Sequence, residues 1–461
     1  MPEWTDERFA ASVREELIDD ILPFWRSRTV DERWGGFIGQ MSNDLRVRED
    51  APKGLILNAR ILWSFSAFYG YTRDDRDRAL AQRAYEYLTD RFLDKQHGGY
   101  FWELDPTGNV LDDRKKIYGQ AFCIYALAEY YRTFNESLAL QQATDVFDLI
   151  EAHASDRRYG GYFEVMSRDW QPCEDMRLSD KDMNEKKSMN NHLHVLEGYT
   201  NLVRVLSTGG HLKAEDPVCS DAVRRYPPSS CGHARTEDMP LRAHYEQVAT
   251  RRLRDLIELF ARHIVNAEQT HFQHFFDEAW TPRSDSYTFG HDIEGSWLLC
   301  EAAEVLDGVV SWASCPRRIE GVPPSDRGQD ARDTMVQSLA VRMARAVLEE
   351  GLDKDGGLFY EGRAGRIVNP NREWWPQAEA VVGFYNAWQL TGEAAFREAA
   401  VRCWQFIKDR VVDHEQGEWF WCIGPDGTPD PAQPKVSAWK GPYHNGRCCL
   451  GILRRTQNNK S

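Results

Sequence analysis

The stretch Gly98-Gly99-Tyr100-Phe101-Trp102 belongs to a short glycine–aromatic signature that recurs along the 461-residue chain. The other copies are Trp34-Gly35-Gly36-Phe37, Gly160-Gly161-Tyr162-Phe163, Gly356-Gly357-Leu358-Phe359-Tyr360 and Gly417-Glu418-Trp419-Phe420-Trp421, with a degenerate copy at His271-Phe272-Gln273-His274-Phe275-Phe276. The copies starting at 35, 98 and 160 are 63 and 62 residues apart, and those at 356 and 417 are 61 apart. Such a period indicates a repeat architecture. Neighbouring acidic, glycine and asparagine residues predict a turn into a short strand or hairpin at each copy.

The segments between the copies carry apolar residues at helical spacing, for example Leu80, Ala84 and Tyr87. Each regular interval of about 60 residues has room for two helices. Six copies with two helices each predict an all-α fold, a closed (α/α)6 barrel of six helical hairpins with short β-hairpins in the rim loops. In such a ring every hairpin buries its faces against its neighbours and no end stays open.

We expect a single domain over residues 1–461. Two intervals between signature copies are too long for one hairpin. At about 207–240 and 314–330, glycine, proline and polar residues replace the helical period, and we predict surface-loop insertions there. The helical pattern resumes after each insertion, so neither one is expected to be a domain boundary.

Composition narrows the class of protein. Apolar residues make up 42% and charged residues 28%, as in globular proteins with a large core. The net charge of −15 argues against nucleic-acid and membrane partners. An acidic start, no long apolar run and scattered cysteines without a C-x-x-C pair predict a cytoplasmic protein without a signal peptide or membrane span. The 16 Trp suit either a large core or a cleft for a sugar, and we expect a monomer or weak homodimer.

The stretch 187–199 reads as a helix whose apolar face is interrupted by polar residues. Asn190 and His194 are four residues apart and project from the same side. Burying such groups unpaired costs about 1–3 kcal/mol each. The stretches 290–297 and 439–445 also place polar residues where apolar ones are expected. We predict that these two stretches and 187–199 meet in one pocket.

Two histidines facing each other suit the inversion of a carbon next to a carbonyl, which needs a proton removed from one face and returned to the other. Each of His194, His291 and His444 alone could be a satisfied structural histidine, but three in polar patches favour a site. Glu294 lies three residues after His291 and would orient that imidazole. Arg60 or an amide would stabilise an enediolate oxygen.

Zinc is an alternative, since three histidines and a glutamate are adequate ligands. The densest pair, His192 and His194, is spaced i,i+2 and points to different sides of a helix, so we expect no metal and no cofactor. An inverting glycoside hydrolase would need two separated carboxylates, and a non-catalytic sugar-binding protein would have no need for the histidines.

Several long motifs resemble the cellobiose 2-epimerase branch of the N-acylglucosamine 2-epimerase family. They are KSMNNHLHVLEGYTN at 187–201, GHDIEGSWLL at 290–299, EWWPQAEAVVGFYNAWQLTGE at 373–393 and KGPYHNGR at 440–447, with further matches at 53–69 and 118–131. The resemblance implies the same (α/α)6 barrel. It also implies epimerisation at C2 of the reducing-end glucose of a β-1,4-linked disaccharide, or otherwise a monosaccharide 2-epimerase or aldose–ketose isomerase.

The resemblance further implies residue roles. His291 and His444 match the acid/base pair at C2, His194 matches the residue that assists ring opening, and Glu294 matches the partner of the first histidine. The positions that match sugar-holding residues, or an acidic loop near the site, are Arg60, Tyr118, Asp182, Asn190, Trp374, Trp375, Glu379 and Trp439.

Overall fold

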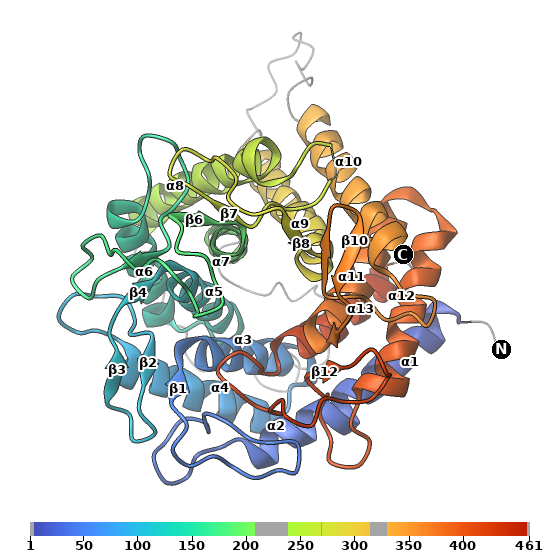
Figure 1. The fold of residues 1–461 in the computed structure, drawn as a ribbon. Helices are drawn as coiled ribbons and strands as arrows, with labels where there is room; N and C mark the ends of the chain where they lie inside the picture. The colour runs from blue at the N-terminus through green and yellow to red at the C-terminus, as the bar shows by residue number, and fades with distance from the viewer. Residues whose placement is uncertain (1–3, 208–237, 269, 314–329, 459–461) are drawn as a thin grey trace.

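The computed structural model describes residues 4–207, 238–268, 270–313 and 330–458. In these ranges an inner ring of helices is surrounded by an outer ring (Figure 1). The inner helices are α3 (Leu55–Thr72), α5 (Ile117–Phe134), α7 (Met189–Ser207), α9 (Phe289–Ala313), α11 (Trp374–Thr391) and α13 (Tyr443–Asn458). Each contacts the next, and α13 closes on α3. The predicted (α/α)6 barrel is therefore confirmed.

The outer helices alternate with the inner ones along the chain. They are α1 (Asp6–Glu15), continued by η1 (Glu16–Ile21) and α2 (Leu22–Arg28), then α4 (Asp75–Tyr87), α6 (Ser137–His153), α8 (Asp238–Leu259), α10 (Asp330–Ala346) and α12 (Ala394–Phe406). One π-helical turn extends each of α4, α8, α10 and α12, namely η2 (Leu88–Phe92), η3 (Phe260–Ile264), η4 (Val347–Gly351) and η5 (Ile407–Val411). Outer helices bury one face, whereas α3 is buried along most of its length, as expected for a helix enclosed on all sides.

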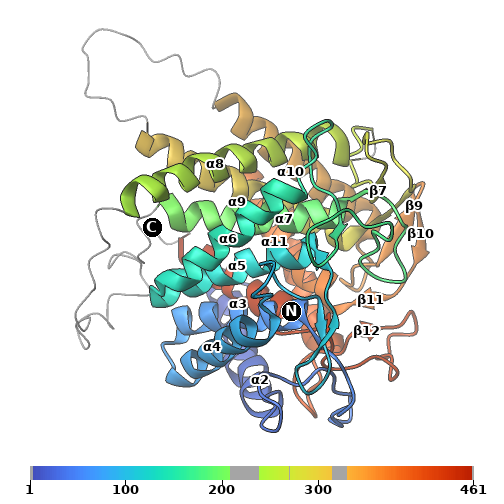
Figure 2. The same cartoon turned by 90° about the vertical axis from the view of Figure 1, so that its left-hand side faces the viewer.

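The strands gather at one end of the barrel (Figure 2). They are β1 (Lys53–Gly54), β2 (Glu103–Leu104), β3 (Val110–Asp112), β4 (Lys115–Lys116), β5 (Val165–Met166), β6 (Lys187–Ser188), β7 (Phe275–Phe276), β8 (Ser286–Thr288), β9 (Glu361–Arg363), β10 (Arg366–Asn369), β11 (Arg372–Glu373) and β12 (Cys422–Ile423). All pair antiparallel, in the orders β1-β2-β3, β10-β9-β8, β11-β12, β4-β5 and β6-β7. The predicted rim hairpins therefore lie together around one mouth.

Every copy of the signature makes the same short antiparallel bridge. The bridged pairs are Val30–Phe37, Leu93–Tyr100, Ser155–Tyr162, Val265–Phe272, Leu352–Leu358 and Val412–Trp419. The degenerate copy is thus a true sixth repeat. A basic residue at the start of an inner helix holds the adjoining turn, as where Lys187 Nζ lies 2.7 Å from both Asp156 Oδ2 and the Gly160 carbonyl oxygen. Contacts of this kind anchor the chain just before several inner helices, near the candidate site residues.

Inner-helix side chains also bind the signature backbone directly. Gln120 Oε1 accepts the Tyr100 N–H at 2.8 Å, and His192 Nε2 accepts the Tyr162 N–H at 2.9 Å. His192 therefore has a structural role, in keeping with its predicted orientation away from His194.

The predicted insertions fall mostly on 208–237 and 314–329, which lie outside the described residues. The described chain resumes in α8 at Asp238 and in α10 at Asp330. No helix of the described ranges is both long and apolar enough to cross a membrane.

Candidate active site

The three predicted histidines lie within the first two turns of three inner helices, at the mouth that carries the strands. His194 is on α7, His291 on α9 and His444 on α13. The Trp375 indole of α11 packs on two of them, with ring centroids 4.7 Å from His291 and 5.7 Å from His444. The structure therefore brings His291 and His444 next to the same aromatic side chain.

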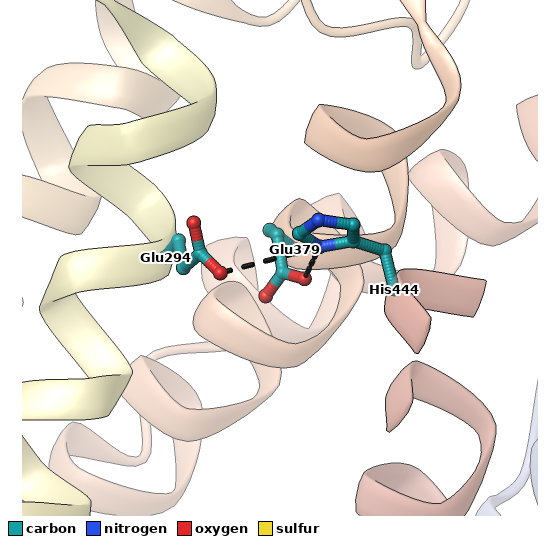
Figure 3. Close-up of side chains that lie close together, drawn as sticks. All are labelled: Glu294, Glu379 and His444. Atoms are coloured by element: carbon teal, nitrogen blue, oxygen red, sulfur yellow. Dashed lines mark hydrogen bonds and ion pairs between the residues drawn. The ribbon is translucent and has the colours of Figure 1, made fainter. Parts of the chain in front are cut away.

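His444 is held by a carboxylate. Its Nδ1 lies 2.7 Å from Glu379 Oε1 and 4.0 Å from Glu294 Oε1 (Figure 3). The other oxygen of Glu379 accepts a hydrogen bond from Trp297 Nε1 at 3.0 Å. A carboxylate accepts but does not donate, so His444 carries its proton on Nδ1 and leaves Nε2 unprotonated.

Arg447 joins the carboxylates of this side of the site. Its Nη2 lies 2.7 Å from Glu379 Oε1 and also contacts Glu294, while Nη1 contacts Glu197. One buried guanidinium thus faces three buried carboxylates. Burial raises the pKa of Glu294 to about 7 and that of Glu379 in the same direction, with mutual repulsion adding to the shift of Glu294. Burial would also raise the pKa of Glu197, but the charge of Arg447 and two hydrogen bonds hold that pKa at about 2.

His194 pairs with the carboxylate one turn further along its own helix. Its Nδ1 lies 2.9 Å from Glu197 Oε2, and the Tyr443 hydroxyl contacts the other oxygen of Glu197. The imidazole packs against the rings of Tyr118 and Phe122, each with its centroid 4.8 Å away. His194 is thereby tied to Arg447 through Glu197.

His291 is held by a neutral group. Its Nδ1 lies 2.5 Å from Thr288 Oγ1 at the end of β8. The predicted pairing of His291 with Glu294 is wrong, because Glu294 turns to the charged Arg447 instead. A guanidinium attracts a buried carboxylate more strongly than a neutral imidazole does. Desolvation, with three neighbouring histidines, holds the pKa of His291 well below its usual value.

The pKa of His444 is lowered as well. Desolvation, followed by the charges of Arg60 and Arg447, keeps its pKa well below the ordinary value. Both imidazoles are therefore neutral near pH 7 and able to accept a proton.

Arg60 of α3 is a buried cation with neutral partners. Its Nη1 donates to the Trp439 carbonyl oxygen at 2.9 Å and its Nη2 to the Tyr118 hydroxyl at 3.0 Å. Its Nε has no hydrogen-bond partner in the described part of the chain. A guanidinium so placed retains the capacity to stabilise an anionic oxygen.

The remaining predicted residues line the same mouth or its rim. Trp374 packs 6.3 Å from His444, centroid to centroid, and its buried Nε1 has no partner among the described groups. Asn190 is the second residue of α7, one turn before His194, and its Oδ1 has no hydrogen-bond partner among the described groups. Asp182 accepts bonds from the Ser179 N–H and hydroxyl at 2.7 and 3.0 Å, so its visible role is to shape its own loop.

That loop borders a pocket of about 250 Å³ next to the site. Trp102 and Trp439 line it, with ring centroids 5.9 Å apart, together with Glu103 and Lys116. Lys116 Nζ lies 4.5 Å from the Trp102 ring and donates to the Leu178 carbonyl oxygen at 2.8 Å. The pocket adjoins Arg60 through Trp439, whose carbonyl oxygen Arg60 binds.

One group of side chains in the described ranges has metal-ligand types in reach of each other. Ligand atoms of Glu294, Glu379 and His444 lie within 4.8 Å of one another (Figure 3). Arg447 already occupies both carboxylates, and a cation added there would meet the guanidinium charge.

No role in the site was predicted from the sequence for Arg447, Glu197, Tyr443 or Thr288. Arg447 stood within the quoted motif at 440–447, three residues after His444. Glu197 stands three residues after His194, the same spacing that singled out Glu294 after His291. That second H-x-x-E spacing was an available signal.

Comparison with known proteins supports one family. The model of the N-acylglucosamine 2-epimerase family matches residues 36–190 and 242–448. A "Cellobiose 2-epimerase" of Bacteroides fragilis is 38% identical over 97% of this chain and 99% of its own length. The solved structure of a cellobiose 2-epimerase from Bacillus thermoamylovorans superposes with a TM-score of 0.80 and 33% identity, covering 97% of this chain and 100% of the other.

A more distant likeness concerns the fold alone. The crystal structure of a D-mannose isomerase aligns with a TM-score of 0.74 and 19% identity, covering 99% of this chain and 100% of the other. The family match and the near full-length relatives decide the classification. The chain therefore belongs to the N-acylglucosamine 2-epimerase family and is an isomerase.

Proposed function

We propose that this isomerase epimerises C2 of the reducing-end glucose of β-1,4-linked disaccharides such as cellobiose and lactose. The observation that carries the proposal is the pair of neutral histidines against Trp375, each with Nδ1 engaged by the protein. Each then presents Nε2 to a ligand, and removal and return of the C2 proton on opposite faces needs two such groups.

The proposed steps need no cofactor. With the sugar ring open, one histidine takes the C2 proton and the electron pair forms the enediolate, whose oxygen Arg60 stabilises. The other histidine, after its neutral Nε2 has taken up a proton from solvent, delivers that proton to the opposite face of C2, and the carbonyl at C1 re-forms. The first histidine then releases its proton to solvent, which restores the neutral pair. His194, backed by Glu197, is proposed to move the proton between the ring oxygen and the C1 hydroxyl during opening and closing.

The neighbouring pocket supports a disaccharide as substrate. A wall of Trp102 and Trp439 suits the apolar face of a second sugar unit, and Glu103 and Lys116 offer polar contacts to its hydroxyls. Relatives that are 38% and 34% identical over nearly all of the chain are named cellobiose 2-epimerases. A monosaccharide 2-epimerase or aldose–ketose isomerase is the second candidate, favoured by the more distant relative named "D-mannose isomerase" and by relatives named "N-acylglucosamine 2-epimerase" that match less than a quarter of this chain.

A glycoside hydrolase is disfavoured by the carboxylates themselves. An inverting hydrolase needs an acid and a base about 6.5–9.5 Å apart with water between them. Here Glu294 and Glu379 belong to one cluster of ligand atoms within 4.8 Å and share Arg447. We propose a cytoplasmic monomer or weak homodimer that acts on small sugars without nucleic acid or membrane.

The test is incubation with cellobiose, lactose, mannose and N-acetylglucosamine in deuterated water, followed by NMR and mass spectrometry. Two different histidines acting on the two faces should place deuterium at C2 of the 2-epimer from early turnover. Product that retains protium at C2 would refute the two-histidine mechanism. Free glucose without an epimer would refute the functional proposal.

A further inference from the structure

A second histidine, His274, packs beside His291 on the neutral side of the site. It directly precedes β7, within the degenerate copy of the repeated signature. The two imidazole rings meet edge to face, with centroids 5.9 Å apart. Thr288 lies between them, because its hydroxyl oxygen is 2.5 Å from His291 Nδ1 and 3.4 Å from His274 Nε2.

The backbone settles which nitrogen of His274 is unprotonated. The Thr288 N–H points at His274 Nε2 over 3.2 Å, and only a nitrogen with a free lone pair accepts such a bond. Neutral His274 therefore carries its proton on Nδ1. Desolvation holds the pKa of His274 at about 4, so this neutral form persists near pH 7.

The proton of the Thr288 hydroxyl then has two possible directions. If it points to His274 Nε2, the Thr288 oxygen is free to accept Nδ1–H of His291, and His291 Nε2 keeps a lone pair for a substrate proton. If it points to His291 Nδ1, the proton of neutral His291 sits on Nε2 and the imidazole enters turnover as an acid. Both arrangements leave each of these groups with a partner, but only the first makes all three contacts hydrogen bonds, with His274 Nε2 as a shared acceptor. The second leaves no proton between Thr288 Oγ1 and His274 Nε2 at 3.4 Å.

We infer that His274 and Thr288 are positioning residues that fix the tautomer of His291, so that its Nε2 is the base. The inference rests on the proposed function, because it assigns the hydrogen-bonded chain His274–Thr288–His291 to proton transfer at C2. On the other side of the site, Glu379 achieves the same tautomer for His444 with a charged acceptor.

The test compares Thr288→Val, which keeps the shape but loses the hydroxyl, with Thr288→Ser, which keeps the hydroxyl. Thr200→Val is the matched control, since the buried Thr200 hydroxyl donates only to the Leu196 carbonyl oxygen on α7. We expect Thr288→Val and His274→Phe to lower kcat by about 10- to 100-fold with KM changed little. Thr288→Ser and Thr200→Val should stay near the wild type.

Isotope exchange separates this role from a general structural one. If Thr288→Val impairs only the His291 step, the epimer deprotonated by His444 should gain deuterium at C2 in deuterated water faster than it is converted. The opposite epimer should gain none before conversion. Equal exchange from both epimers, or Thr288→Val with kcat near the wild type, would overturn the inference.

A spectroscopic measurement keeps the inference independent of the proposed function. In protein with ¹⁵N-labelled histidine, the nitrogen shifts of His291 should report a protonated Nδ1 in the wild type and a shift toward protonated Nε2 in Thr288→Val. A wild-type His291 protonated on Nε2 would overturn the inference even if the enzyme is an epimerase. A wild type that exchanges C2 of none of the sugars would instead overturn the proposed function.

Discussion

His444 and His291 contact the same Trp375 indole, but the groups that hold their Nδ1 atoms differ in charge. His444 rests on a Glu379 carboxylate that Arg447 and Trp297 also bind. His291 rests on a neutral hydroxyl. An imidazolium is better stabilised beside a carboxylate than beside a hydroxyl. The two sides of the site should therefore differ in how readily they hold the transferred proton, although both start neutral.

The difference between the two sides arises from the partners that the neighbouring glutamates bind. His194 and His291 each have a glutamate three residues later on the same helix, yet only His194 bonds to its own, Glu197. Glu294 turns to Arg447, and His291 turns to Thr288. The same i,i+3 spacing therefore allows a His–Glu hydrogen bond but does not ensure that it forms. For Glu294, the charge of Arg447 on α13 determines the partner.

The largest expected effect is the loss of either histidine. His291→Ala and His444→Ala should each lower turnover by about 10²–10⁴-fold, because each face of C2 needs its own proton-transfer group. Steady-state assays with melting curves would check this. His263→Ala is a matched control, since His263 is exposed on η3 and stacks on Trp280 away from the site. Near-full activity in either site variant would contradict the paired assignment.

Glu379→Gln tests the charged side of the comparison. The amide cannot supply the negative charge that stabilises protonated His444, and it can donate to Nδ1 and so reverse the tautomer. We expect kcat to fall by about 10- to 100-fold. Glu349→Gln on the exposed surface of η4 is the control. An unchanged kcat in Glu379→Gln would show that the carboxylate serves only to hold Arg447.

The sequence predicts the barrel well because its signal is repeated and local. Even the degenerate copy at His271-Phe272 makes the bridge that the other copies make. The site residues that begin inner helices were likewise predictable from polar residues on apolar helices. Arg447 was not, because its partners Glu197 and Glu379 are 250 and 68 residues away along the chain. Arg447 matters because it joins side chains of α7 and α11 to α13 when the barrel closes. A local sequence pattern cannot predict such contacts.

Stability against pH should sharpen the comparison further. The folded-state pKa of His291 lies below the usual 6.5, so the unfolded chain binds the proton more readily as the pH falls below that value. His291 therefore favours unfolding progressively below about pH 6.5, by up to about 1.4 kcal/mol per pH unit. The raised pKa of Glu294 acts in the opposite sense, since its contribution is lost as the pH rises toward 7.

His291→Gln isolates the histidine contribution. Relative to the wild type, its free energy of unfolding should improve as the pH drops from 7.5 to 5, because it has no imidazole to protonate. Urea unfolding at a series of pH values measures this difference. A difference that stays constant over that range would mean that His291 titrates alike in the folded and unfolded chain.

The smallest expected effect is that of metal removal. In the described ranges only the His444 side offers clustered ligand types, and there Arg447 already neutralises Glu294 and Glu379. Among the described residues, the Thr288 hydroxyl and the His274 imidazole lie around Nδ1 of His291. A metal bound by Glu294, Glu379 and His444 would therefore lie on the His444 side and affect the two proton transfers unequally. Extensive treatment with EDTA should leave kcat and the deuterium pattern unchanged. If activity were lost and only added zinc or manganese restored it, the cluster in Figure 3 would be a metal site with Arg447 displaced, and the two-histidine mechanism would fail.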